Sequence, residues 1–159
     1  MKILIATDGS EYSRAAIEKC CEIAVKLENT AIKIVAVYHA YTPPGTFSLS
    51  VQYRQYAEEF KDSLHKLAEE HAEEALTIIQ ACLPAAAAID LTTHVAMGAA
   101  DRIIVETAEE WNADLIVVGA HGYGFWGRAM IGSVSDSVIH HAPCSVLVVR
   151  KTLPKQSIK

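Results

Sequence analysis

The sequence of 159 residues lacks any long apolar run and any excess of basic residues. Only four apolar residues, 3–6, separate the N-terminal Met1-Lys2 pair from Thr7, and this is too short for the apolar region of a signal peptide. A membrane-spanning helix needs roughly 18 or more apolar residues in succession, and no stretch approaches that length. Nucleic-acid binding needs a basic face, whereas the formal net charge is −5. We therefore expect a cytoplasmic protein that neither spans a membrane nor binds nucleic acid.

Cysteine is also scarce, and its placement argues against two roles. Cys20, Cys21, Cys82 and Cys144 include no C-x-x-C pair and accompany no secretory signal. We expect reduced thiols, with Cys20 and Cys21 packed on the apolar face of a helix rather than engaged in redox chemistry. No histidine–cysteine cluster has the spacing of metal ligands, so we expect no dedicated metal site.

What the sequence does contain is a regular alternation of strand-like and helix-like patterns, with no internal repeat and no linker. The pattern predicts a single domain over residues 1–151, followed by a flexible tail over residues 152–159. The expected strands cover residues 2–6, 31–40, 89–96, 114–119 and 145–150, the expected helices cover 13–27, 51–83, 100–111 and 133–141, and residues 41–50 read as a surface loop. In the long second helix, the stripe expected to face the core is Tyr53, Tyr56, Phe60, Leu64, Leu67, Ala75 and Ile79.

This alternation predicts an α/β fold: an open, five-stranded parallel sheet with helices on both faces. Five such strands commonly take the order 3-2-1-4-5, in which the winding reverses between the first and the fourth strand. A ligand crevice is expected where the carboxyl ends of these two strands lie side by side. The residues after them are Thr7-Asp8 and the segment that begins at Gly119.

The segment from Gly119 to Ser135 is rich in glycine, with four of the eight glycines between Gly119 and Gly127 and a fifth at Gly132. Glycine lets the backbone approach a ligand closely, and a helix that begins near Ser133 presents free N–H groups to an anion. The hydroxyls of Ser133 and Ser135 and the charge of Arg128 can add to such a phosphate cradle. The alternative is an ordinary helix start, in which Ser133 is the N-cap and Asp136 completes a capping box.

The spacing Gly119-x2-Gly122-x9-Gly132-Ser133 resembles the ATP-binding signature of the universal stress protein family. The resemblance covers almost the whole chain, from the opening residues 2–10 through residues 114–119 to the closing residues 143–149. It implies an open Rossmann-like fold of the adenine nucleotide alpha hydrolase type, which matches the fold expected above. It also implies binding of ATP, or of ADP or AMP, in which Mg²⁺ can accompany the phosphates.

The resemblance also implies positions for the ligand. Thr7 and Asp8 would lie beside the adenine and ribose, and Asp8 is an alternative ligand for a divalent ion on the phosphates. His39 matches a position that touches the adenine, where the family usually has an aliphatic residue, and Ala6 stands where proline is more frequent. The remaining expected contacts are Val118 and Gly119 with the base or sugar, and Gly122, Gly132, Ser133, Val134 and Ser135 with the phosphates.

Three functions remain open at this point. The first is a regulatory stress-response protein in which ATP orders residues 123–131 and changes what the protein presents to an unknown protein partner. The second is a slow ATP hydrolase or phosphotransferase, although the loop lacks the Lys-[Ser/Thr] ending of a P-loop. The third is an interaction protein that needs no nucleotide. The resemblance further implies a homodimer formed through the last strand, from Ser145 to Arg150, which would otherwise leave an apolar sheet edge exposed.

Overall fold

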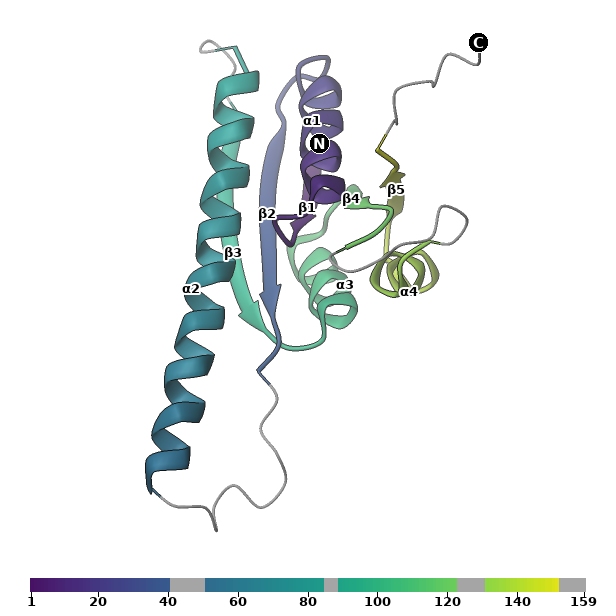
Figure 1. Ribbon diagram of the computed structural model, residues 1–159. Coiled ribbons are helices and arrows are strands. Elements are labelled where there is room, and N and C mark those ends of the chain that lie inside the picture. The colour runs from purple at the N-terminus through teal and green to yellow at the C-terminus, as the bar shows by residue number, and fades with distance from the viewer. Residues whose placement is uncertain (41–50, 85–88, 123–130, 152–159) are drawn as a thin grey trace, which may run out of the picture.

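The computed structural model describes residues 1–40, 51–84, 89–122 and 131–151, and Figure 1 shows their arrangement. Strands and helices alternate along the chain, as the sequence pattern predicts. The strands are β1 (Lys2–Thr7), β2 (Ala31–Tyr38), β3 (Asp90–Met97), β4 (Leu115–Gly119) and β5 (Ser145–Val149). The helices are α1 (Glu11–Ala24), α2 (Val51–Cys82), α3 (Ala100–Trp111) and α4 (Ser133–His141).

The five strands form one parallel sheet in the order β3-β2-β1-β4-β5, so the predicted topology is confirmed. In the register, Ile3 of β1 lies between Ile32 of β2 and Leu115 of β4. The chain therefore winds toward β3 in its first part and toward β5 in its second part. The reversal lies between β1 and β4, whose carboxyl ends meet at the same edge of the sheet.

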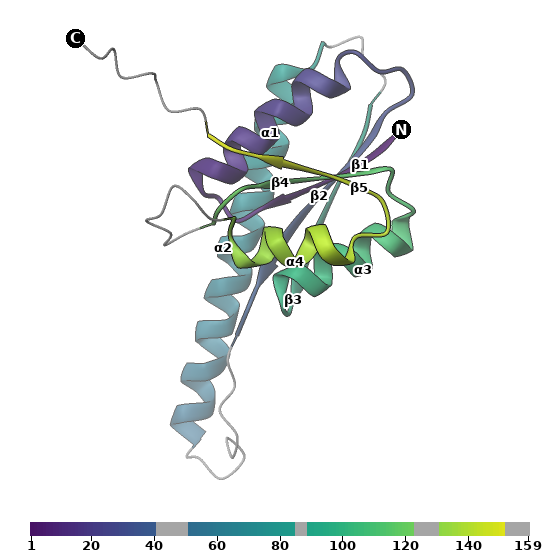
Figure 2. The same ribbon diagram turned by 90° about the vertical axis from the view of Figure 1, so that its right-hand side faces the viewer.

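The helices form a layer on each face of the sheet, and Figure 2 shows α1 and α2 opposite α3 and α4. Neighbouring residues of β1 point to opposite layers, as the twofold period of a strand requires. Ile3 and Ile5 pack with α1 and α2, whereas Leu4 packs with α3 and with Val138 of α4. All four side chains are fully buried, which explains why the strand reads as a continuous apolar run.

Element boundaries lie within three residues of the expected ones, and the largest difference is at the C-terminal end of α1. Helix α1 begins at Glu11 rather than at residue 13, because the Ser10 hydroxyl caps it by accepting a hydrogen bond from the Ser13 N–H (3.2 Å). It ends at Ala24, and the turn beyond it is tightened by a bond from the Leu27 N–H to the Ala24 carbonyl (3.1 Å). The predicted loop at 41–50 and the predicted tail at 152–159 lie outside the described residues.

The expected apolar stripe of α2 is wrong in its first half. Tyr56 is 70% exposed and Phe60 is 61% exposed, and the buried residues of this helix are Ala68, Ala72, Ala75 and Ile79. Figure 1 shows the reason, since the first turns of α2 extend past the sheet and have no layer to pack against. In the described ranges, no helix combines the length and hydropathy that a membrane span needs.

Candidate functional site

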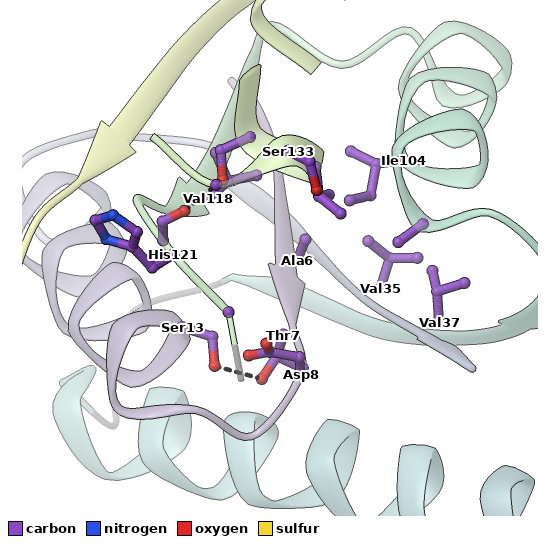
Figure 3. A pocket seen from close by; sticks show the side chains of 16 residues that line it. Ala6, Thr7, Asp8, Ser13, Val35, Val37, Ile104, Val118, His121 and Ser133 are labelled. Carbon is purple, nitrogen blue, oxygen red and sulfur yellow. Dashed lines mark hydrogen bonds between the residues drawn. The ribbon is translucent and has the colours of Figure 1, made fainter. Parts of the chain in front are cut away.

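The topological reversal is occupied by a cavity of about 430 Å³ at the carboxyl ends of β1 and β4 (Figure 3). This volume lies within the range of roughly 300–1,000 Å³ that is typical of sites for small ligands. Strand ends, the first turn of α1 and the N-termini of α3 and α4 all contribute. The lining residues are Ala6, Thr7, Asp8, Ser13, Val35, Val37, Ala100, Ile104, Val118, Gly119, His121, Gly122, Gly132, Ser133, Val134 and Ser135.

The turn after β1 brings Asp8 to the cavity in a defined orientation. Its carboxylate Oδ1 accepts a hydrogen bond from the Ser10 N–H (3.0 Å), which is the bond of an Asx turn. Gly9 has a φ of +74°, and a Cβ there would lie 2.4 Å from the ring of His71 on α2. Glycine is therefore favoured by the backbone conformation, and the turn that carries Asp8 lies against the His71 side chain of α2.

The hydroxyl groups of Thr7 and Ser13 form the polar lining of the cavity next to this turn. Thr7 is buried, and its Oγ1 donates to the Oγ of Ser13 on α1 (3.3 Å) while accepting from the Gly9 N–H (3.3 Å). Ser13 in turn donates to the Ser10 carbonyl (2.9 Å). These bonds tie the first turn of α1 to the end of β1, so the floor of the cavity is preorganised before any ligand enters.

The N-terminus of α4 opens into the opposite end of the cavity. Gly132 is the N-cap and, among the described residues, no side chain caps the helix, so the alternative of a capping box with Ser133 as N-cap is wrong. The Gly132 N–H donates to the Ala120 carbonyl (2.8 Å), and the first helical bond runs from the Asp136 N–H to the Gly132 carbonyl (2.9 Å). The N–H groups of Ser133, Val134 and Ser135 therefore have no partner within the helix, and they supply the donors that an anion needs.

The Ser135 side chain has a structural role. Its hydroxyl donates to the carbonyl of Gly119 at 2.6 Å, and the residue is buried. This bond fixes the start of α4 against the end of β4. The hydroxyl of Ser133, by contrast, belongs to an exposed residue at the first position of the helix and borders the cavity. Ser133 is thus better placed than Ser135 to donate a side-chain hydrogen bond to a ligand.

Two glycines mark close approaches of the backbone. A Cβ on Gly119 would lie 2.7 Å from the carbonyl carbon of Tyr12, so β4 and the first turn of α1 pack backbone to backbone. A Cβ on Gly122 would lie 2.7 Å from Oδ2 of Asp8. The Asp8 carboxylate and the segment after β4 therefore face each other across a gap with no room for a side chain at Gly122.

One wall of the cavity is apolar, and the motif reasoning missed most of it. We call Ala6, Val35, Val37, Ala100, Ile104 and Val118 the apolar wall. Figure 3 shows Val35, Val37 and Ile104 grouped on one side of the cavity, away from Thr7 and Asp8. Nothing in the sequence distinguishes these aliphatic residues from ordinary core residues. Only the register of β2 beside β1 and the position of α3 bring them to the site.

Nearly all predicted site residues lie together in this cavity, with two that do not. His39 is exposed just beyond the end of β2 and does not line the cavity, where Val35 and Val37 of the same strand do. Arg128 lies outside the described residues. The predicted residues that line the cavity are Ala6, Thr7, Asp8, Val118, Gly119, Gly122, Gly132, Ser133, Val134 and Ser135.

His121 is a further lining residue that the motif reasoning did not assign. It follows β4 and is 9% exposed. Its ring lies against that of Tyr12, with centroids 5.1 Å apart and planes tilted by 57°. This contact joins the segment after β4 to the first turn of α1, the same two elements that meet at Gly119.

A charged link joins the two helices of the α3–α4 layer close to the cavity. The Oγ of Ser137 donates to Oδ2 of Asp101 at 2.7 Å. This hydrogen bond holds the pKa of the Asp101 carboxyl below its usual value, because it stabilises the ionised form. Among the described residues, no cluster of three or more His, Cys, Asp or Glu side chains is arranged to hold a metal ion.

A family model, sequence relatives and solved structures agree on one family for this chain. The profile described as the universal stress protein family matches residues 1–150. A Staphylococcus aureus protein described as a universal stress protein is 34% identical over 149 residues, which cover 93% of this chain and 82% of that protein. The structure of the universal stress protein UspA from Lactobacillus plantarum has a TM-score of 0.77 at 24% identity, covering 94% of this chain and 97% of that one. A universal stress protein solved in complex with cAMP is 26% identical, with a TM-score of 0.63 and coverage of 96% and 98%.

Proposed function

This chain belongs to the universal stress protein family, and from that premise we propose that it binds an adenine nucleotide in the cavity between β1 and β4. We further propose that the bound nucleotide regulates the protein's interaction with a partner rather than being a substrate for rapid turnover. The observation that carries the proposal is the meeting, in one cavity, of an apolar wall and an uncapped helix N-terminus.

The apolar wall is the proposed site of the base. A purine ring buries two flat faces, and each Å² of apolar surface removed from water contributes roughly 25 cal/mol. Val35, Val37 and Ile104 offer such a surface, Thr7 and Asp8 lie away from it in the same cavity, and we assign these two residues to the ribose. The relative solved with cAMP supports an adenine-containing ligand for this fold. ATP, ADP, AMP and cAMP share that part, so the wall by itself does not choose among them.

The N-terminus of α4 is the proposed site of the phosphates. Its free N–H groups and the Ser133 hydroxyl are donors, and Gly122 and Gly132 allow the backbone to approach. Each helix-dipole term is worth only about 0.3–1 kcal/mol, so several donors must act together. The Asp8 carboxylate borders the same space and would repel a bare triphosphate. We propose that ATP enters with Mg²⁺, which would lie between the phosphates and Asp8 and keep several of its waters.

Calorimetric titration of the full chain tests the proposal. The ligands are Mg-ATP, AMP, cAMP, adenosine and inorganic phosphate, and mass spectrometry of the denatured protein checks for nucleotide that co-purifies. Adenosine is expected to bind measurably and phosphate alone only weakly, while EDTA weakens ATP binding without affecting adenosine. No recovered nucleotide, together with no heat on adding Mg-ATP, would contradict nucleotide binding.

A separate measurement decides between regulation and catalysis. Typical enzymes turn over at roughly 1–1,000 per second, so phosphate release from ATP above about one per second would overturn the regulatory proposal.

We also propose a homodimer formed through β5. Val146, Leu147 and Val148 of this edge strand are only partly buried in a single chain, and such an edge favours pairing with another strand. Light scattering that finds only a 17.3 kDa species would contradict the dimer.

A further inference from the structure

Helices α1 and α2 lie side by side on one face of the sheet, and their contacts follow a constant offset along the two sequences. Arg14 forms an ion pair with Glu74, an offset of 60 residues. Ile17 and Ile78 border the same small gap between the helices, an offset of 61. A constant offset means that the two helices run in parallel, because each rises about 1.5 Å per residue.

One helical turn further along α1 and α2, the same offset brings two cysteines opposite each other. Cys21 lies one turn beyond Ile17, and Cys82 lies one turn beyond Ile78, again at an offset of 61. The thiols of Cys21 and Cys82 lie close enough to interact, because Cys82 is one of the groups that raise the pKa of Cys21. Cys21 is buried against α2, whereas Cys82 is the last residue of α2 and is exposed. One thiol of the pair is therefore open to solvent and the other lies directly behind it.

From this juxtaposition we propose that Cys21 and Cys82 are a modification site, at which a peroxide oxidises the pair to a disulfide that joins α1 to the end of α2. The site is separate from the nucleotide cavity, which is lined by Ser13 in the first turn of α1, whereas Cys21 lies in the last turn of that helix. The proposal does not rest on nucleotide binding, so either can fail without the other.

The chemistry proceeds in two balanced steps. The exposed Cys82 sulfur attacks one oxygen of hydrogen peroxide, the O–O bond breaks, and water leaves as Cys82 becomes a sulfenic acid. The Cys21 sulfur then attacks the Cys82 sulfur, the S–O bond breaks, and the hydroxyl leaves with the Cys21 proton as a second water. Two thiols are oxidised by two electrons and one peroxide is reduced to two waters.

The surroundings predict a slow reaction. Burial, the largest cause, and the neighbouring Cys82 thiol together raise the pKa of the Cys21 thiol to about 12. We therefore expect the disulfide to form over minutes to hours under excess peroxide, as uncatalysed disulfide formation does. The disulfide is therefore expected to accumulate only when oxidation is sustained.

Peptide mapping of the peroxide-treated full chain tests the pairing. Wild-type protein is expected to lose two of its four free thiols and to show trypsin fragments 20–26 and 67–102 joined until a reductant is added. Because fragment 20–26 contains both Cys20 and Cys21, the Cys20→Ala variant identifies the partner and should keep the link. The Cys82→Ser variant changes only an exposed side chain and should lose it.

Thermal unfolding gives the second readout. A disulfide between residues this far apart restricts the unfolded chain, and we expect the melting temperature of the oxidised wild type to rise by roughly 5–15 °C, reversibly with reductant. Cys82→Ser treated with peroxide should show no rise. Four free thiols after treatment, a Cys82 sulfinic acid without a link, disulfide-linked dimers on a non-reducing gel, or a link that persists in Cys82→Ser would each overturn the proposal.

Discussion

The two sides of the cavity are built by different means. The apolar wall consists of side chains on β1, β2, β4 and α3 that continue directly into the core. The polar lining, which we call the polar rim, comprises Thr7, Asp8, Ser13, Gly122, Gly132 and Ser133, and it lies where β1 and β4 end and where α1 and α4 begin. The comparison teaches that specificity for a base can be an extension of ordinary core packing, whereas an anion site needs backbone donors and glycines at set positions.

The largest expected effect comes from Gly119, where the two sides join. In Gly119→Ala the new Cβ would lie 2.7 Å from the Tyr12 carbonyl carbon, which is backbone and cannot swing away. We expect a loss of about 1–3 kcal/mol in the free energy of unfolding, together with weaker binding on both sides of the cavity. Urea unfolding measures the first and calorimetry the second. An unchanged midpoint would show that β4 and α1 are not packed as described.

The apolar wall can be filled without touching the polar rim. Ala100 is the first residue of α3 and lines the cavity, so Ala100→Phe should occupy the space proposed for the base. We expect affinity for adenosine and for ATP to fall roughly 100-fold, which corresponds to about 2.7 kcal/mol. The matched control is Ala99→Phe at the exposed neighbouring position, which does not line the cavity. Equal losses in both variants would contradict the assignment of the wall.

The polar rim can likewise be changed while the apolar wall is left intact. In Ser133→Asp a negative charge is placed at the first position of α4, where it stabilises the helix by about 0.3–1 kcal/mol but repels a phosphate. We expect the protein to be as stable as wild type or more so, while ATP and AMP bind roughly 10-fold more weakly, equivalent to about 1.4 kcal/mol. Adenosine affinity should be unchanged, and Ser133→Ala serves as the uncharged control. If adenosine weakens equally, the two sides are not separate.

The smallest expected effect tests the link that holds α4, on the polar rim, to α3, on the apolar wall. The Ser137 hydroxyl lowers the pKa of Asp101 in the folded protein, so its contribution to stability is present above the unfolded pKa of about 3.9 and is lost as pH falls below it. We expect Ser137→Ala to lower the free energy of unfolding at pH 7 by about 1 kcal/mol or less. The difference from wild type should shrink between roughly pH 5 and pH 3. A difference that stays constant with pH would show that packing, not the hydrogen bond, is responsible.

Much of the fold follows from local patterns, and the exceptions have physical causes. The alternation of elements and the buried apolar strands led to the order β3-β2-β1-β4-β5, because parallel strands and right-handed crossovers leave few alternatives. The prediction of a buried stripe on α2 was wrong for Tyr56 and Phe60. Periodicity reveals an apolar face, but it does not reveal whether another layer extends far enough to cover that face. Helix α4 begins at Ser133 as predicted, and its N-cap is Gly132, whose N–H is bound by the Ala120 carbonyl in a contact between separate segments.

The sequence by itself determined the polar rim apart from Ser13, since glycine spacing and the residues that follow strands are local features that a linear pattern records. The tertiary structure decided the apolar wall, because Val35, Val37 and Ile104 differ from other core residues only in where the register of the sheet and the packing of α3 place them. It also decided the contact of Cys21 with Cys82, which depends on the parallel offset of two helices. Contacts between distant segments carry no signature in composition or spacing, because each partner satisfies its own local pattern equally well without the other.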